Sequence, residues 1–144
     1  MVQEVNLSKH YAKKLTKQFY RDFKRAIKRE YDCIHIINPT IEQEKYLRGI
    51  GKTTTIIKLA IKYNIPICYK NYSKLLTIKD ICNRLSPLSL PSLCYIDSRF
   101  IYRELKGRKI VLVDEDISIE DIRQIKEANP MITIIGFSRI IEKN

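Results

Sequence analysis

The sequence predicts an α/β fold, in which a parallel sheet of about four or five strands carries helices on both faces. Short apolar runs alternate with segments of helical periodicity, as in chains that build a three-layer parallel sheet. The run Ile110-Val111-Leu112-Val113 is aliphatic throughout, which is typical of a strand buried on both faces. Residues 1–31 instead combine regular apolar spacing with nine basic and three acidic residues, so a basic amphipathic helix should precede the sheet.

That first helix is expected over residues 7–30. Its apolar positions recur every fourth residue, with basic residues between them: Leu7, Tyr11, Leu15, Phe19, Phe23, Ile27 and Tyr31. We therefore expect residues 1–31 to form a basic helix packed on a domain that comprises residues 32–144.

The remaining elements follow from apolar runs and from helix-ending residues. Asn64, Gly107 and Asn129-Pro130 each predict a helix end, and Ser118 with Asp121 resembles a capping box. Residues 86–91, with two prolines, predict a loop. Strands are expected at 33–37, 65–69, 110–113 and 131–137, and helices at 52–63, 77–85, 97–105 and 118–128.

Composition limits the classes of function. The 144 residues carry a net charge of +11, which favours contact with polyanions such as nucleic acid. No apolar run is long enough for a membrane span, and no signal peptide is recognisable, so we expect a cytoplasmic protein (host cytoplasm if it is viral) without membrane contact. The four cysteines and two histidines fit no metal-binding or redox spacing.

A loop rich in glycine precedes the helix expected at 52–63. Glycines allow successive N–H groups to point at phosphate, and the following helix adds its positive N-terminal end. We expect this loop to bind a nucleotide, with Lys52 on the phosphates and the Thr53 hydroxyl on Mg²⁺. The predicted nucleotide-binding residues are Gly49, Ile50, Gly51, Lys52, Thr53 and Thr54. Tyr46 occupies the position of the first glycine in the full phosphate-loop pattern, so either the loop after residues 33–37 is enlarged or it is remodelled.

Acidic residues follow the aliphatic run at 110–113. Asp114 is the predicted Mg²⁺ ligand, and Glu115 is the predicted residue that orients or deprotonates a water molecule. Ser138 and Arg139 follow the last expected strand and are candidates for contact with the terminal phosphate and for stabilising developing charge. All these segments should meet at one edge of the sheet, because the carboxyl ends of parallel strands lie together.

With both motifs in place, the chain resembles P-loop NTPases of the branch that carries a catalytic glutamate beside the metal-binding aspartate. Residues 47–60 and the segment Leu105-Lys106-Gly107-Arg108 are similar to small AAA-like ATPases encoded by bacteriophages. The resemblance spans roughly residues 33–139 and implies an ATP- and Mg²⁺-binding α/β fold, used in phages for DNA packaging, replication or helicase loading. The chain lacks a guanine-reading Asn-Lys-x-Asp segment, which favours ATP over GTP.

Three functions therefore stand as hypotheses. The first is a small ATPase of bacteriophage type, and the second is a non-catalytic module on a degenerate NTPase scaffold that binds nucleic acid or a protein partner, including a second copy of itself. The third is a small-molecule kinase. The predicted nucleic-acid contacts are the basic residues of the first helix: Lys13, Lys14, Lys17, Arg21, Lys24, Arg25 and Lys28.

Overall fold

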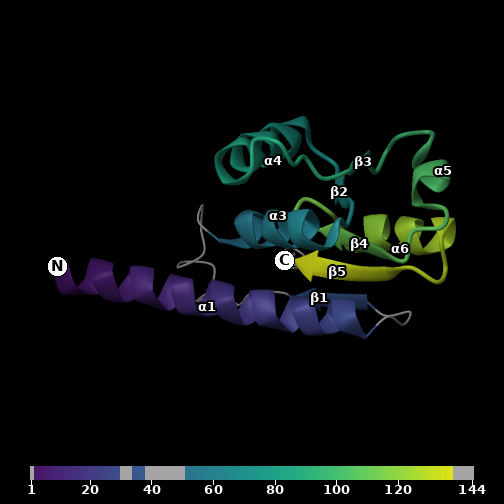
Figure 1. Ribbon diagram of the computed structural model, residues 1–144. Helices are drawn as coiled ribbons and strands as arrows, with labels where there is room; N and C mark the ends of the chain where they lie inside the picture. The colour runs from purple at the N-terminus through teal and green to yellow at the C-terminus, as the bar shows by residue number, and fades with distance from the viewer. Residues whose placement is uncertain (1, 30–33, 38–50, 138–144) are drawn as a thin grey trace, which may run out of the picture.

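The computed structural model describes residues 2–29, 34–37 and 51–137, and in these ranges five strands form one parallel sheet (Figure 1). The strands run side by side in the order β1-β5-β4-β2-β3. Their bounds are β1 Ile34–Ile37, β2 Ile67–Tyr69, β3 Leu93–Tyr95, β4 Ile110–Val113 and β5 Thr133–Phe137. The helices are α1 Val2–Lys28, α3 Lys52–Tyr63, α4 Tyr72–Leu85, α5 Ile101–Leu105 and α6 Ile119–Ala128. This architecture confirms the predicted α/β class.

Each central strand sends alternate side chains to opposite faces of the sheet. On β4, Leu112 packs into a cluster with α1, α3 and α4, whereas Val111 and Val113 pack into a second cluster with α5 and α6. Ile135 and Ile134 on β5 divide in the same way. The sheet is therefore covered on both faces, which explains why its central strands are aliphatic without polar alternation.

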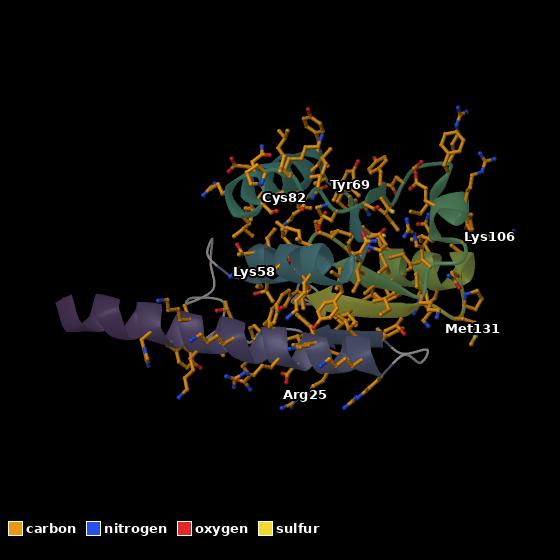
Figure 2. The ribbon with its side chains drawn as sticks, viewed as in Figure 1. Arg25, Lys58, Tyr69, Cys82, Lys106 and Met131 are labelled. Atoms are coloured by element: carbon orange, nitrogen blue, oxygen red, sulfur yellow. The ribbon has the colours of Figure 1, made fainter. Side chains whose placement is uncertain are left out.

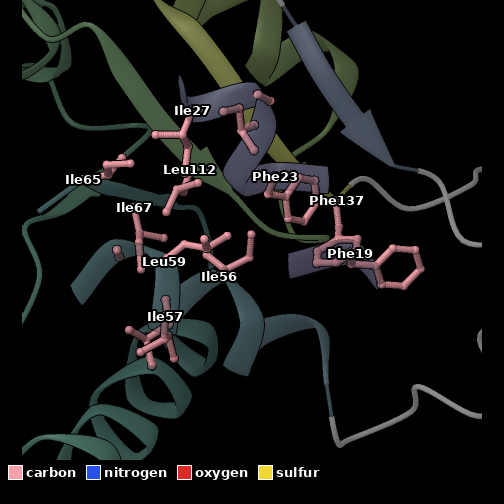
Figure 3. Close-up of a cluster of buried hydrophobic side chains, with 14 of the residues drawn as sticks. Phe19, Phe23, Ile27, Ile56, Ile57, Leu59, Ile65, Ile67, Leu112 and Phe137 are labelled. Atoms are coloured by element: carbon pink, nitrogen blue, oxygen red, sulfur yellow. The ribbon is translucent and has the colours of Figure 1, made fainter. Parts of the chain in front are cut away.

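The apolar stripe of α1 fastens this helix to the sheet, as predicted. Phe19 and Phe23 are buried and meet Phe137 of β5 edge to face, with ring centroids 5.3 and 5.1 Å apart (Figure 3). One predicted position is wrong, because Tyr11 is 40% exposed and the neighbouring Ala12 is buried. Tyr31 and the side chain of Leu7 lie outside the described part of the chain.

Several predicted boundaries are confirmed. Asn64 ends α3 in the left-handed conformation, with φ 54°, as expected of a residue that stops a helix. Ser118 and Asp121 form the predicted capping box at the start of α6. The strand expected at 33–37 is present as β1, and the loop expected after it lies outside the described residues.

Other boundaries differ from the expectations. The strand β3 was not predicted, because a three-residue edge strand is too short to show a periodic pattern. Helix α4 begins at Tyr72 rather than at residue 77, and α5 begins at Ile101 rather than at residue 97. The earlier start of α4 matters for the site, because it adds a turn of helix that carries Lys74.

Gly136 has φ 154°, a backbone conformation that residues with a side chain rarely adopt. It is paired with Val113 in the sheet, and a Cβ atom at position 136 would lie 1.8 Å from the Val113 carbonyl oxygen. No side chain fits at this distance, so glycine is required here. Since Val113 is the last residue of β4, this contact also fixes where the acidic residues after the strand are placed.

Within the described residues, no helix has the length and apolar character needed to cross a membrane.

Candidate functional site

The two sequence motifs meet at the carboxyl edge of the sheet. Helix α3 begins at Lys52, directly after its N-cap residue Gly51, and β4 ends at Val113, directly before Asp114 and Glu115. The hydroxyl of Thr55 donates to the Gly51 carbonyl oxygen at 2.6 Å and ties the first turn of the helix to its cap. The start of α3 and the end of β4 thus form one site from segments about sixty residues apart.

Two short hydrogen bonds join these segments. The Lys52 ammonium donates to Glu115 Oε2 at 2.7 Å, and the Thr53 hydroxyl donates to Asp114 Oδ2 at 2.5 Å. The Glu115 N–H also donates to Asp114 Oδ1 at 2.8 Å. Asp114 is 1% exposed and Lys52 is 6% exposed, whereas their partners Thr53 and Glu115 are partly exposed. Thr53 and Asp114, the two predicted metal ligands, are therefore in contact, and Lys52 is paired with Glu115.

The oxygen atoms at this site suit Mg²⁺. Hard divalent cations prefer carboxylate and hydroxyl oxygens, and Mg²⁺ is usually held by one or two protein groups together with water and substrate phosphates. The Asp114 carboxylate and the Thr53 hydroxyl provide that combination on adjacent elements. No group of three or more His, Cys, Asp or Glu side chains in the described ranges forms a self-sufficient metal site.

Lys74 is a site residue that the sequence analysis missed. Its ammonium lies 3.1 Å from Asp114 Oδ2, 3.4 Å from Thr53 Oγ1 and 4.0 Å from Glu115 Oε1. The signal was present, because Lys74 precedes two buried residues of α4, Ile78 and Cys82, at intervals of four. Extending the helix back by one turn would have placed this lysine on its buried face.

Asp116 holds the start of α4 beside the site. Its Oδ2 accepts hydrogen bonds from the Lys70 and Asn71 N–H groups at 2.8 and 3.5 Å, so Asp116 is tied to the segment that leads into α4. Burial raises the pKa of this carboxyl, although the hydrogen bonds oppose that shift. Its Oδ1 is buried with no hydrogen-bond partner among the described residues.

An ion pair connects the same segment to α6. The Lys70 ammonium lies 3.2 Å from both carboxylate oxygens of Asp121. Burial alone would raise the pKa of Asp121, but its hydrogen bonds from Ser118 and the Lys70 charge outweigh burial and lower it. The loop between β2 and α4 is therefore anchored by two carboxylates, and Lys74 projects from an anchored turn.

Two of the six predicted nucleotide-binding residues and two catalytic candidates have no place in this geometry. Gly49 and Ile50, as well as Ser138 and Arg139, lie outside the described residues, as does Tyr46. Gly51, Lys52, Thr53 and Thr54 are described and form the start of α3.

A hollow lies between α1 and α3. It is a cavity of about 270 Å³ whose lining carries three basic groups and no acidic one: Thr16, Lys17, Tyr20, Arg21, Thr55 and Lys58. Six of the seven predicted nucleic-acid contacts are exposed on α1, and the seventh, Lys24, is half-buried. Figure 2 shows Arg25 on the side of α1 that faces away from the sheet. The basic surface of α1 thus continues onto α3 through Lys58.

Comparison with known proteins identifies no relative of this chain. A scan against protein-family models finds no matching family, and searches of the curated proteins and of the solved structures find no match either.

Proposed function

We propose that this protein binds MgATP at the junction of α3 and β4 and hydrolyses it. The observation that carries this proposal is the double pairing of Lys52 with Glu115 and of Thr53 with Asp114. The candidates for phosphate binding, metal binding and proton transfer thus lie together at one edge of a parallel sheet, where such folds bind their ligands.

Each described residue has a distinct role in the proposed reaction. Lys52 neutralises phosphate charge at the positive end of α3, after leaving its bond to Glu115. Thr53 and Asp114 would hold Mg²⁺, which neutralises charge on the phosphates when it is bound. Glu115, released from Lys52 and 28% exposed in its side chain, is then able to accept a proton from the attacking water.

Equilibrium binding of a fluorescent ATP analogue in the presence of Mg²⁺ tests the proposal. The parent should bind, Lys52→Ala should weaken binding at least ten-fold, and Lys62→Ala should bind like the parent because Lys62 is an exposed lysine of the same helix. Failure of the folded parent to bind at millimolar MgATP would exclude the proposed function.

A second function, contact with nucleic acid, is supported by the cationic hollow between α1 and α3. Three basic side chains without an acidic neighbour in the lining attract phosphate groups, and the exposed basic residues of α1 extend the same field. We propose that the ATPase acts on DNA through this surface; packaging, replication and helicase loading are the processes to which the sequence resemblance points.

Salt-dependent DNA binding tests this second function. The double variant Lys17→Glu/Arg21→Glu should lose most of the affinity for duplex or single-stranded DNA, whereas Lys106→Glu, at an exposed position after α5, should lose much less. Affinity should fall as salt rises. DNA binding equal in the parent and the double variant would refute the assignment of this surface.

A further inference from the structure

The oxygens of Thr53 and Asp114, which the proposed function gives to Mg²⁺, are already in contact with a cation of the chain itself. Lys74 Nζ lies within 3.4 Å of the Thr53 hydroxyl oxygen and of Asp114 Oδ2, and 4.0 Å from Glu115 Oε1. These are the oxygens that a divalent ion would need. We propose that Lys74 is an internal counter-ion that competes with Mg²⁺ for Asp114 and moves to the nucleotide phosphates when MgATP binds.

The charges of the four groups indicate that Mg²⁺ replaces Lys74 at Asp114 rather than binding beside it. Lys52 and Lys74 provide two positive charges, and Asp114 and Glu115 provide two negative charges, so the four groups neutralise one another at close range. A divalent ion entering alone would meet the Lys74 ammonium at its carboxylate ligand. The repulsion at this short distance, in a buried setting, disfavours metal binding until Lys74 leaves.

The triphosphate provides the destination for Lys74. Its phosphate oxygens accept hydrogen bonds from an ammonium group, so MgATP brings both the cation that replaces Lys74 and the anion that receives it. The side chain of Lys74 is 14% exposed, and it belongs to the first turn of α4, which Asp116 anchors through the Lys70 and Asn71 N–H groups. The ammonium can therefore move on its flexible stem while the helix remains in place.

The movement of Lys74 makes the binding of metal and of nucleotide cooperative. Mg²⁺ alone should bind weakly, and nucleotide should bind better with Mg²⁺ than without it, because each ligand removes a cost that the other would face alone. Lys74 thus controls access of the metal to Asp114 and contacts the phosphates of the bound nucleotide. This role rests on the proposed function, but the affinity for the metal without nucleotide can be measured separately.

The experiment measures binding of Mn²⁺, a paramagnetic substitute for Mg²⁺, without nucleotide by electron paramagnetic resonance. Lys74→Met keeps the length of the side chain and removes its charge, and Asp114 retains its hydrogen bonds from Thr53 and from the Glu115 N–H. We expect Lys74→Met to bind Mn²⁺ at least ten-fold more tightly than the parent. Lys74→Arg, which keeps the charge, and Lys79→Met, at an exposed position of α4, should bind like the parent.

A second measurement separates this inference from the proposed function. Binding of the ATP analogue should be strengthened by Mg²⁺ in the parent and much less so in Lys74→Met, because in the variant no lysine has to move from Asp114 to the phosphates when the metal binds. Equal Mn²⁺ affinity of the folded parent and Lys74→Met would overturn the inference even if the parent binds MgATP. Tight Mn²⁺ binding by Lys74→Met would support the metal competition even if the parent bound no ATP.

Discussion

The Lys52 ammonium lies 2.7 Å from Glu115 Oε2, although 63 positions separate the two residues in the chain. One is the proposed phosphate ligand and the other is the proposed base, so both proposed roles require this pair to separate. Ligand binding must therefore break a charge-assisted hydrogen bond, which is among the stronger kinds in proteins.

Glu115→Gln should therefore separate binding from turnover. The amide is a weaker partner for Lys52, so less free energy is needed to transfer the lysine to phosphate, and we expect ATP to bind about as tightly as in the parent or a few-fold more tightly. Hydrolysis should fall by about 10²-fold or more, because the candidate base is lost. Binding by fluorescence and phosphate release in single turnover measure the two effects, and unchanged hydrolysis would remove Glu115 from the mechanism.

Asp114→Asn should abolish the effect of Mg²⁺ on nucleotide binding. The amide keeps an oxygen for Thr53 but has lost the charge that holds a divalent ion. ATP affinity should become nearly independent of Mg²⁺, and it should resemble the affinity of the parent in excess chelator. A titration of nucleotide at fixed high and low Mg²⁺ measures this, with Asp80→Asn, at an exposed position of α4, as the control. A parent-like Mg²⁺ effect in Asp114→Asn would place the metal elsewhere.

Asp116→Asn should stabilise the fold at neutral pH but not in acid. Burial raises the pKa of this carboxyl in the folded protein above its ordinary value of about 3.9, so the ionised form is disfavoured by folding. The resulting loss of stability is absent below the ordinary pKa, grows as the pH rises through the folded-state pKa and is complete above it. Asparagine does not ionise, so the melting temperature of the variant should exceed that of the parent at pH 7, and this advantage should disappear near pH 3.5.

Thermal unfolding at several pH values tests the ionisation of Asp116. The exposed Asp80→Asn variant should show a much smaller difference from the parent at every pH, since exposed ion pairs contribute little. An advantage of Asp116→Asn that persists unchanged at pH 3.5 would contradict an origin in the charge of Asp116.

Phe23→Ala should destabilise the whole fold. Phe23 is fully buried and packs edge to face on Phe137 at 5.1 Å, so its removal leaves a cavity between α1 and the sheet. We expect a loss of about 3–5 kcal/mol in the free energy of unfolding. Urea denaturation measures the loss, with Phe100→Ala as the matched control because Phe100 is 45% exposed. A loss below about 1 kcal/mol would show that α1 is not part of the cooperative unit.

The sequence predicted those features that depend on local chemistry. The aliphatic run of β4, the left-handed Asn64 and the capping box of Ser118 each bear a signal within a few residues, and the structure confirms them. The pairing of Lys52 and Thr53 with the acids after β4 followed from a rule of topology, the common edge of parallel strands. Local signals and this rule together were enough to predict that the start of α3 and the residues after β4 lie side by side.

Features that depend on long-range packing were not predicted. β3 is three residues long, too short to show a periodic pattern, and it is a strand because it pairs with β2. Lys74 was missed because its role depends on where α4 begins, and that start is set by hydrogen bonds to Asp116, which lies more than forty residues later. Buried lysines of this kind are hard to identify from sequence, since most lysines are exposed.

The close contact of Gly136 with Val113 has a consequence for how this protein can change over evolution. Every other amino acid carries a Cβ atom, which would lie 1.8 Å from the Val113 carbonyl oxygen and force β5 away from β4. Asp114 directly follows that strand end. A substitution at position 136, although glycine itself has no functional side chain, would therefore displace Asp114 and its hydrogen-bond partners. Related chains that retain the acidic pair are therefore expected to keep glycine at this position, even where their surface loops have diverged beyond recognition.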